Sequence, residues 1–240
     1  MAVTAPSFPG FRPEAIQFLA DLAANNDRAW FQPRKAEYER LLKEPMEELC
    51  VALEAEFRGR EIPLHADAAR SPFRIYRDTR FSKDKSPYKT HVAASFAWAG
   101  DGIDTATGRS HTESVHASGG YFHLQPGEIY VGGGVWHPDK EWITAFRERI
   151  ADDYDGFRDL VEAPAFKGTF GEVGDDGESL KRVPTGFPPD HPAADVLRLK
   201  NVTFGRRLSD VEAMSPDLPV VIADSFAVGT PLMRYLASLG

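Results

Sequence analysis

The sequence has a single cysteine, Cys50, so an internal disulfide cannot form. It has no apolar run approaching the ~18 residues that a membrane-spanning helix needs. Residues 1–11 lack the basic and apolar segments of a secretory signal. Together these absences predict a protein of the reducing cytoplasm that does not enter a membrane.

The spacings of common catalytic and cofactor sites are also missing. There is no G-x-S-x-G elbow and no Walker-type or dinucleotide-binding glycine loop. None of the seven histidines has cysteine or carboxylate neighbours at zinc-site spacing, although His91, His123 and His137 would converge if their strands were neighbours. Cys50 lies on an apolar face of a predicted helix, which favours core packing over a nucleophile. We therefore predict no metal site, and no cofactor is indicated.

The net charge of −8 argues against a general nucleic-acid coat protein. Hydrophobic residues make up 42% of the chain and charged residues 27%, which are ordinary values for a globular protein. A chain of 240 residues can bury enough surface to fold without disulfides or metals. Basic residues therefore bear on function only where they cluster.

Hydrophobic periodicity changes along the chain and predicts one α+β domain over residues 1–240. A helical start at 13–57 contains helices at 13–24 and 33–57, the second kinked or divided at Pro45. The middle, 70–136, predicts strands at 73–79, 91–98, 121–125 and 128–135, with a tight turn at Pro126-Gly127 and a long loop at 99–120. Further elements are a helix at 139–161, a strand at 197–204, and a helix at 218–239 that bends or divides at Pro231. The predicted architecture is a mostly antiparallel sheet flanked by N-terminal and C-terminal helices.

A basic segment at residues 70–89 is the most unusual part of the sequence. Its seven basic residues face only Asp78 and Asp84, a local balance of +5 on an acidic protein. Such an island attracts an anion locally. The predicted ligand-binding residues in this segment are Arg74, Arg77, Arg80, Lys83, Lys85, Tyr88 and Lys89.

Strand periodicity makes Arg77 the central residue of this hypothesis. If Phe73 and Ile75 face the core, Arg77 faces inward as well. A desolvated guanidinium needs a partner, which is either an internal carboxylate or a bound phosphate or carboxylate. The alternative is that the segment is a solvated surface with ordinary Arg–Asp pairs. Asp78 and Asp84 are the nearby candidates for acid–base catalysis, given a shifted pKa.

Two other segments are weaker candidates for ligand binding. The triple glycine 132–134 predicts a bulge or a close approach of another backbone, or a ligand contact at Gly133 and Gly134, with Trp136 and Pro138 as possible walls. Lys181 and Arg182 form a smaller basic cluster, which either completes an anion site or is simply exposed.

At these residues the chain resembles the microbial family known as domain of unknown function 2461. The similar stretches are Phe18-Leu19, Asn25-Asn26, Arg28, Trp30-Phe31, residues 77–90 (RDTRFSKDKSPYKT), Gly132-Gly133-Gly134, Trp136, Pro138, Leu180-Lys181-Arg182, Pro184, Gly186 and His191-Pro192. The resemblance implies no activity, cofactor or partner. A His- and Thr-rich stretch at 101–118 is longer than the family pattern and receives no family role.

Three functional hypotheses follow. The first is a cytoplasmic protein that binds a small phosphate- or carboxylate-bearing ligand through residues 74–89, with or without catalysis. The second is a non-catalytic module whose basic face docks an acidic protein. The third, less favoured because of the acidic net charge, is nucleic-acid contact through the same island, with steep salt dependence. The sequence leaves the reaction, the ligand and the oligomeric state open.

Overall fold

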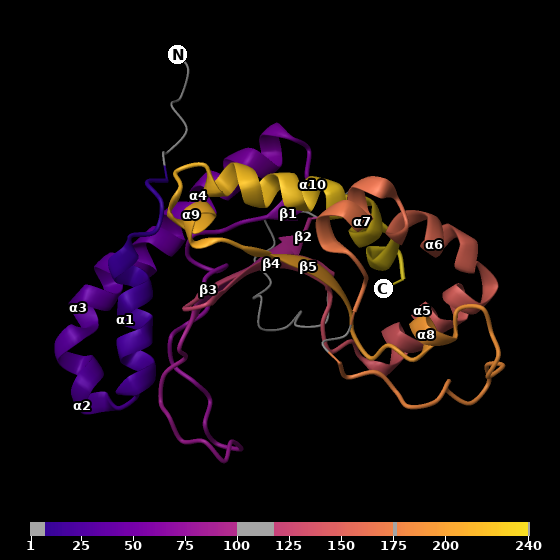
Figure 1. The fold of residues 1–240 in the computed structure, drawn as a ribbon, viewed down its shortest axis with the longest axis horizontal. Coiled ribbons are helices and arrows are strands. Elements are labelled where there is room, and N and C mark those ends of the chain that lie inside the picture. Colours follow the sequence, from indigo (N-terminus) through magenta and orange to yellow (C-terminus); the bar gives the residue numbers. More distant parts are fainter. Residues whose placement is uncertain (1–7, 100–117, 175–176, 240) are drawn as a thin grey trace.

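The computed structural model describes residues 8–99, 118–174 and 177–239, and it confirms the α+β fold. Five antiparallel strands form one sheet in the order in which they occur along the chain (Figure 1). The strands are β1 (Leu64–His65), β2 (Val92–Trp98), β3 (Gly119–Gln125), β4 (Glu128–Val135) and β5 (Val202–Leu208). As predicted, β3 and β4 form a tight hairpin through Pro126-Gly127, where Gly127 has a φ of +77°.

Helices precede and follow the strand-rich middle. The N-terminal ones are α1 (Pro13–Ala24), α2 (Arg28–Phe31), η1 (Gln32–Arg34), α3 (Lys35–Tyr38), η2 (Glu39–Lys43) and α4 (Glu44–Gly59). The later ones are α5 (Lys140–Asp152), α6 (Tyr154–Val161), α7 (Pro164–Phe170), α8 (Ala194–Leu197), α9 (Asp210–Met214) and α10 (Leu218–Ala237).

Proline and aspartate explain where the helices divide. Pro45 has no N–H, and a π-helical turn, η2, ends just before it, so the predicted interruption at this proline is confirmed. The predicted 139–161 helix divides at Asp153, whose carboxylate accepts the Gly156 N–H at 3.0 Å and so caps α6. Pro231 does not divide α10, which continues through it as one helix.

One face of the sheet carries the helices and the core. Figure 1 shows α4, α7 and α10 on this side. Phe122 and Leu124 from β3 and Ile129 and Val131 from β4 are buried beneath them. In the described part of the chain, α10 alone is long and apolar enough to cross a membrane by length and composition, and it packs against β4 and α4 as a core helix does.

The other face, which we call the second face, carries the alternate residues of each strand. The pairing places Ala93, His123, Tyr130 and Arg207 in one row across β2 to β5. The neighbouring row contains Ser95, Tyr121, Gly132 and Gly205. Small residues therefore surround a few rings on this face.

Some predicted strands differ in the structure. The segment 73–79 is not a regular strand, because the chain leaves the sheet edge after residue 73. Only isolated bridges form here: Pro72, just before the segment, pairs with Ala94, and Tyr76 pairs with Tyr88. The strand predicted at 197–204 begins later, at Val202, because Leu197 ends α8 and residues 198–201 form the turn between that helix and the strand; β5 then extends to Leu208. Most of the predicted loop at 99–120, with His111 and His116, lies outside the described residues, and β3 already includes Gly119 and Gly120.

Candidate functional site

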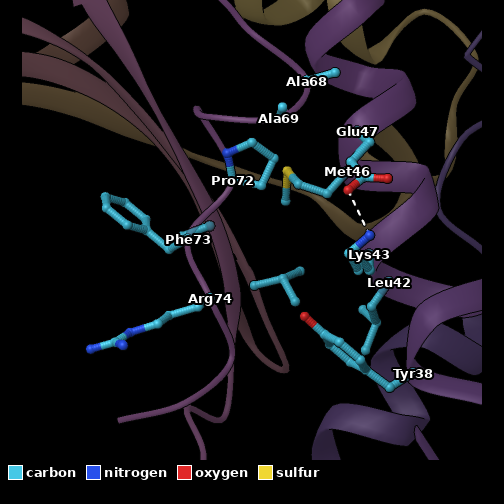
Figure 2. A pocket seen from close by; sticks show the side chains of 12 residues that line it. Tyr38, Leu42, Lys43, Met46, Glu47, Ala68, Ala69, Pro72, Phe73 and Arg74 are labelled. Atoms are coloured by element: carbon cyan, nitrogen blue, oxygen red, sulfur yellow. Dashed lines mark ion pairs between the residues drawn. The ribbon is translucent and has the colours of Figure 1, made fainter. Parts of the chain in front are cut away.

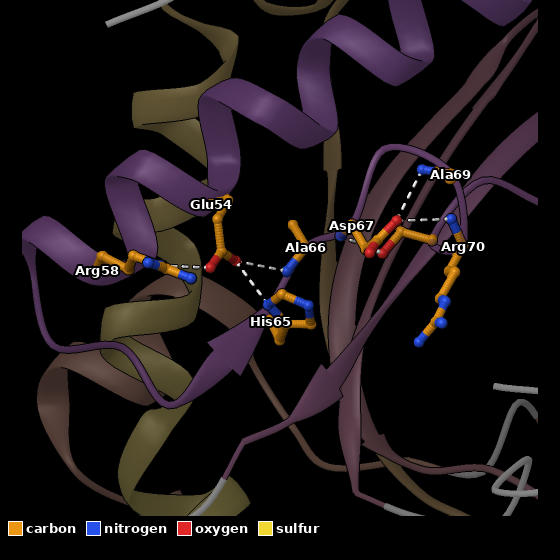
Figure 3. Close-up of polar contacts among 8 residues, drawn as sticks. Glu54, Arg58, His65, Ala66, Asp67, Ala69 and Arg70 are labelled. Carbon is orange, nitrogen blue, oxygen red and sulfur yellow. Dashed lines mark hydrogen bonds and ion pairs between the residues drawn. The ribbon is translucent and has the colours of Figure 1, made fainter. Parts of the chain in front are cut away.

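Residues 72–91 contain most of the basic segment and form an irregular hairpin that extends from the edge of the sheet. We call it the basic hairpin. Its entry is held by α4 and a tight turn (Figure 3). The Glu54 carboxylate accepts the Ala66 N–H at 2.9 Å, and Asp67 accepts the N–H groups of Ala69 and Arg70 at 2.8 and 3.0 Å. Carboxylates that accept backbone N–H groups fix a turn without regular structure.

The exit of the hairpin is held by Tyr88, which was predicted to orient a ligand. Tyr88 is only 1% exposed, and its ring stacks on Phe31 with centroids 4.1 Å apart. The Asn26 side chain accepts the Tyr88 N–H at 3.0 Å and donates to the Tyr88 carbonyl at 2.9 Å. In the structure this side chain joins the hairpin to the N-terminal helices, and its ligand-orienting role stays a prediction.

At the tip, the expectation of an unpaired, inward Arg77 is wrong. The Arg77 guanidinium pairs with Asp84 and donates to the Ser86 carbonyl at 3.3 Å. Arg80 donates to the Asp78 carboxylate from Nε and Nη2, at 3.0 and 2.7 Å. The alternation argument failed because it assumed a regular strand with Phe73 in the core, whereas Phe73 is 43% exposed.

The same pairs lower the pKa values of Asp78 and Asp84, the two acid–base candidates, which argues against a role as catalytic acid. Side-chain and backbone hydrogen bonds from Arg80 lower the pKa of Asp78 to about 2. The Ser86 N–H, the Ser86 hydroxyl and then Arg77 lower the pKa of Asp84 well below its ordinary value. A catalytic acid near neutral pH needs a raised pKa, so both carboxylates act here as structural partners of arginines.

The other tip residues face solvent. Lys83 is exposed, and the Lys85 ammonium donates to the Thr79 carbonyl at 2.8 Å. Phe81 is 96% exposed at the tip. The two Arg–Asp pairs, Arg77 with Asp84 and Arg80 with Asp78, lie among these exposed residues.

The base of the hairpin holds two cations, Arg74 and Lys89, which in the described part of the chain lack the carboxylate partners that Arg77 and Arg80 have. Within the described residues, no carboxylate oxygen lies within 4.0 Å of either one. The Lys89 ammonium lies 4.9 Å from the centroid of the Phe73 ring, and burial, followed by the nearby Arg74, lowers its pKa. Figure 2 shows Phe73 and Arg74 extending away from the α3–α4 side, where Tyr38 and Met46 line a cavity of about 220 Å³.

A chain of rings crosses the second face beside Lys89. Ring centroids lie 6.4 Å apart for Phe73 and Tyr121, 5.6 Å for Tyr121 and His123, and 5.7 Å for His123 and Tyr130. His91 lies 5.9 Å from His123. We call these five residues the ring chain. The sequence had suggested that His91 and His123 could converge, and they do, but the aromatic rings beside them were not predicted.

Small neighbours make the ring chain possible. A Cβ on Gly205 would overlap the Tyr130 phenol, and a Cβ on Gly132 would lie 2.7 Å from the same hydroxyl oxygen. The Tyr130 ring therefore lies directly over these two glycines. Here the glycines provide space for a side chain rather than unusual backbone angles.

Burial keeps the ring-chain histidines neutral. Desolvation, then His123 and Lys89, lower the pKa of His91 to about 4, and desolvation also lowers the pKa of His123. The buried His123 Nε2 has no hydrogen-bond partner in the structure. Desolvation raises the pKa of Tyr121 to about 12. At neutral pH, the basic charge at this site is carried by Arg74 and Lys89.

The low His91 pKa predicts a loss of stability on mild acidification. Between pH 6.5 and about 4 the unfolded chain binds a proton at His91 that the folded chain does not, so the free energy of unfolding falls as the pH falls. Allowing for partial exposure, we expect a loss on the order of 2 kcal/mol across this window.

Chemical denaturation at several pH values measures this loss. His91→Gln should reduce it, and the part that remains belongs to His123, whose pKa burial also lowers. Asp78 and Asp84 contribute only near the acid end of this window, because their unfolded pKa of 3.8 lies just below it. An NMR titration in which His91 ionises near pH 6.5 would contradict the burial argument.

The remaining predicted residues lie elsewhere. A Cβ on Gly133 would meet the Phe204 ring at 3.0 Å and the Met233 sulfur at 3.1 Å, so the protein's own core fills that space. Gly134 has a φ of +118° and lies against the β5 backbone. The predicted close approach of another backbone is thus confirmed, and at both glycines the space that a Cβ would take is filled by the protein itself.

The second basic cluster does not complete the site. Lys181 and Arg182 are exposed, and Figure 1 shows their segment (orange) at the opposite end of the molecule from the basic hairpin (magenta). No group of three or more His, Cys, Asp or Glu side chains suited to a metal occurs among the described residues. Cys50 is buried, which raises the pKa of its thiol to about 12, in agreement with a core role.

Comparison with known proteins places the chain in a family without assigning an activity. No curated protein and no solved structure matches it. Residues 14–235 match the family described as "Conserved hypothetical protein (DUF2461)". This match covers the helical start, the basic hairpin, the sheet and most of α10, and the chain therefore belongs to that family.

Proposed function

We propose that the protein binds a small phosphate- or carboxylate-bearing ligand at Arg74 and Lys89, at the base of the basic hairpin. The observation that carries the proposal is the environment of the Lys89 ammonium. This ammonium is half-buried and close to a like charge, and no carboxylate lies within 4.0 Å among the described residues. A bound anion would compensate for both the burial and the repulsion.

The ring chain supports a ligand with a flat or apolar part. Phe73 lies under the Lys89 ammonium and 6.4 Å from Tyr121, so a ligand anchored at Lys89 is adjacent to aromatic faces. Aromatic rings stack on planar groups in offset or edge-on arrangements. This proposal moves the anion from Arg77 and Arg80, which have their own carboxylates, to Arg74 and Lys89.

Lys89→Met tests the proposal, because methionine retains most of the apolar length and removes only the charge. Inorganic phosphate, acetate and adenosine monophosphate are titrated by calorimetry and in thermal shift assays. We expect at least one probe to bind the wild type, and Lys89→Met to weaken it by about 10- to 100-fold, the value of a charge-assisted hydrogen bond.

Lys83→Met is the matched control, since it removes the same charge from the exposed tip of the same hairpin. It should bind the probe with unchanged affinity. Equal losses in the two variants would indicate general electrostatic attraction, and equal binding by Lys89→Met and wild type would refute the site.

A docking function is the second candidate, and Phe81 is the observation that favours it. A phenylalanine that is 96% exposed beside Arg80 and Lys83 suits an acidic protein partner that offers an apolar pocket. Phe81→Ser would then abolish capture of that partner and leave the small-anion titrations unchanged. Nucleic-acid contact, in contrast, would give binding that falls steeply with salt.

A further inference from the structure

A second cavity lies at the other end of the sheet, where the chain leaves β4 and enters β5. It has a volume of about 390 Å³, and its walls include Pro138, Arg147 of α5, Glu178, Lys200 and Asn201. We propose that this cavity binds a small carboxylate, with Arg147 and Asn201 at its base and Lys200 at its rim. The proposal does not depend on the hairpin site, because the two share no residue.

Arg147 is a partly buried cation without a counter-ion. Its Nε and Nη2 donate to the carbonyls of Leu197 and Leu199, both at 3.0 Å. No carboxylate oxygen lies within 4.0 Å of it among residues 8–99, 118–174 and 177–239, and burial lowers its pKa. A guanidinium has five N–H donors, so the two carbonyls leave donors for a ligand.

Asn201 is a second observation, independent of Arg147: in the described part of the chain, one of its side-chain groups lacks a hydrogen-bond partner. The residue is 1% exposed, and its Oδ1 accepts the His137 N–H at 2.7 Å. That bond fixes the orientation of the amide, yet the buried Nδ2 has no acceptor among the described residues. Buried donors in native proteins are nearly always satisfied. Asn201 lines the cavity, so we assign the missing acceptor to a ligand that binds there.

The backbone at the cavity is also strained. His137 has a φ of +49°, a left-handed conformation that is unfavourable for a residue with a side chain. The Asn201 hydrogen bond holds His137 in this conformation, and the next residue, Pro138, forms part of the wall. Backbone strain of this kind is maintained where the surrounding structure requires a particular shape, and it is common at binding sites.

The charges around the cavity favour a monoanion. Arg147 and Lys200 are positive and Glu178 is negative, so one negative charge on the ligand balances the wall. A carboxylate meets the planar donors of an arginine in two parallel hydrogen bonds. Pro138 and Ile143 offer an apolar surface for the rest of the molecule, and Glu178 would accept an ammonium group on it.

NMR titration of the full chain tests this inference at the atoms concerned. Acetate, glycine and inorganic phosphate are added while the Asn201 side-chain amide and the Arg147 Nε–H are observed. We expect saturable shifts of both signals with acetate or glycine. Lys200→Glu should weaken that binding by at least tenfold, because it reverses a charge at the rim.

Lys181→Glu is the control: it makes the same charge change at an exposed residue that does not line the cavity, and affinity should be unchanged. Asn201→Asp, which keeps the acceptor for His137 and replaces the orphaned donor by an oxygen, should abolish binding in a protein that still folds.

Absence of saturable shifts with acetate and glycine, or equal binding by the Lys200→Glu protein, would overturn the inference. Phosphate binding as tightly as acetate would overturn the carboxylate assignment. Lys89→Met should not affect these signals, so failure here is distinguishable from failure of the proposed function.

Discussion

Gly134→Ala lowers the free energy of unfolding by about 3 kcal/mol or prevents folding. The added Cβ would overlap the Val202 carbonyl oxygen and lie 2.9 Å from the Thr203 Cα. Both are backbone atoms of β5, which pairs with β4 along seven residue pairs and cannot move locally without breaking that pairing. The φ of +118° adds a conformational cost that is independent of the overlap.

Gly127→Ala separates the two causes. Gly127 has a φ of +77° in the β3–β4 turn, and a Cβ there would have no atom within 4 Å. This control should lose only about 1 kcal/mol, the cost of the backbone conformation. Urea denaturation of the two variants and the wild type gives both values. Equal losses would show that the close approach of β5 to Gly134 contributes nothing.

The sheet was predictable because it depends on local alternation. The β3–β4 hairpin follows from two alternating segments around Pro126-Gly127, and the same alternation shows that Tyr121 and His123 face away from Phe122 and the core. Their assembly into the ring chain was not predictable. It also depends on pairing register and on the glycines beneath Tyr130, which no local pattern specifies.

The basic hairpin shows the opposite case. Counting charges pointed to residues 70–89, and assigned the anion to Arg77 and Arg80 and an acid–base role to Asp78 and Asp84. The four residues neutralise one another in local pairs, so the positive charge without partners remains with residues such as Arg74 and Lys89. Charge in a segment therefore indicates a site only after its internal pairs are known.

The cavity beside Arg147 was beyond sequence reasoning for a different reason. Its walls come from α5, from the segment before α8 and from the entry to β5, which lie far apart in sequence. Pro138 had been considered as a pocket wall, and it does line this cavity. The orphaned Asn201 amide becomes visible only when its surroundings are known.

Tyr88→Ala is expected to cost about 3–5 kcal/mol, because it removes a large buried aromatic side chain from a packed core. The ring is 1% exposed, stacks on Phe31 and lies tilted against Tyr76, with centroids 5.4 Å apart. The cavity would lie between the N-terminal helices and the hairpin, where little else can move to fill it. Chemical denaturation measures the loss.

Tyr88→Phe is the matched control and tests whether the residue is structural. It retains the ring and removes only a hydroxyl that accepts a weak hydrogen bond from Gln32 at 3.5 Å, so it should cost less than about 1 kcal/mol. A ligand-orienting phenol would give the reverse pattern: Tyr88→Phe would weaken anion binding at Lys89 and leave stability unchanged. Because the Tyr88 backbone is held by Asn26 on both sides, Lys89 stays in place in the Phe variant, and its affinity for the probe should equal that of the wild type.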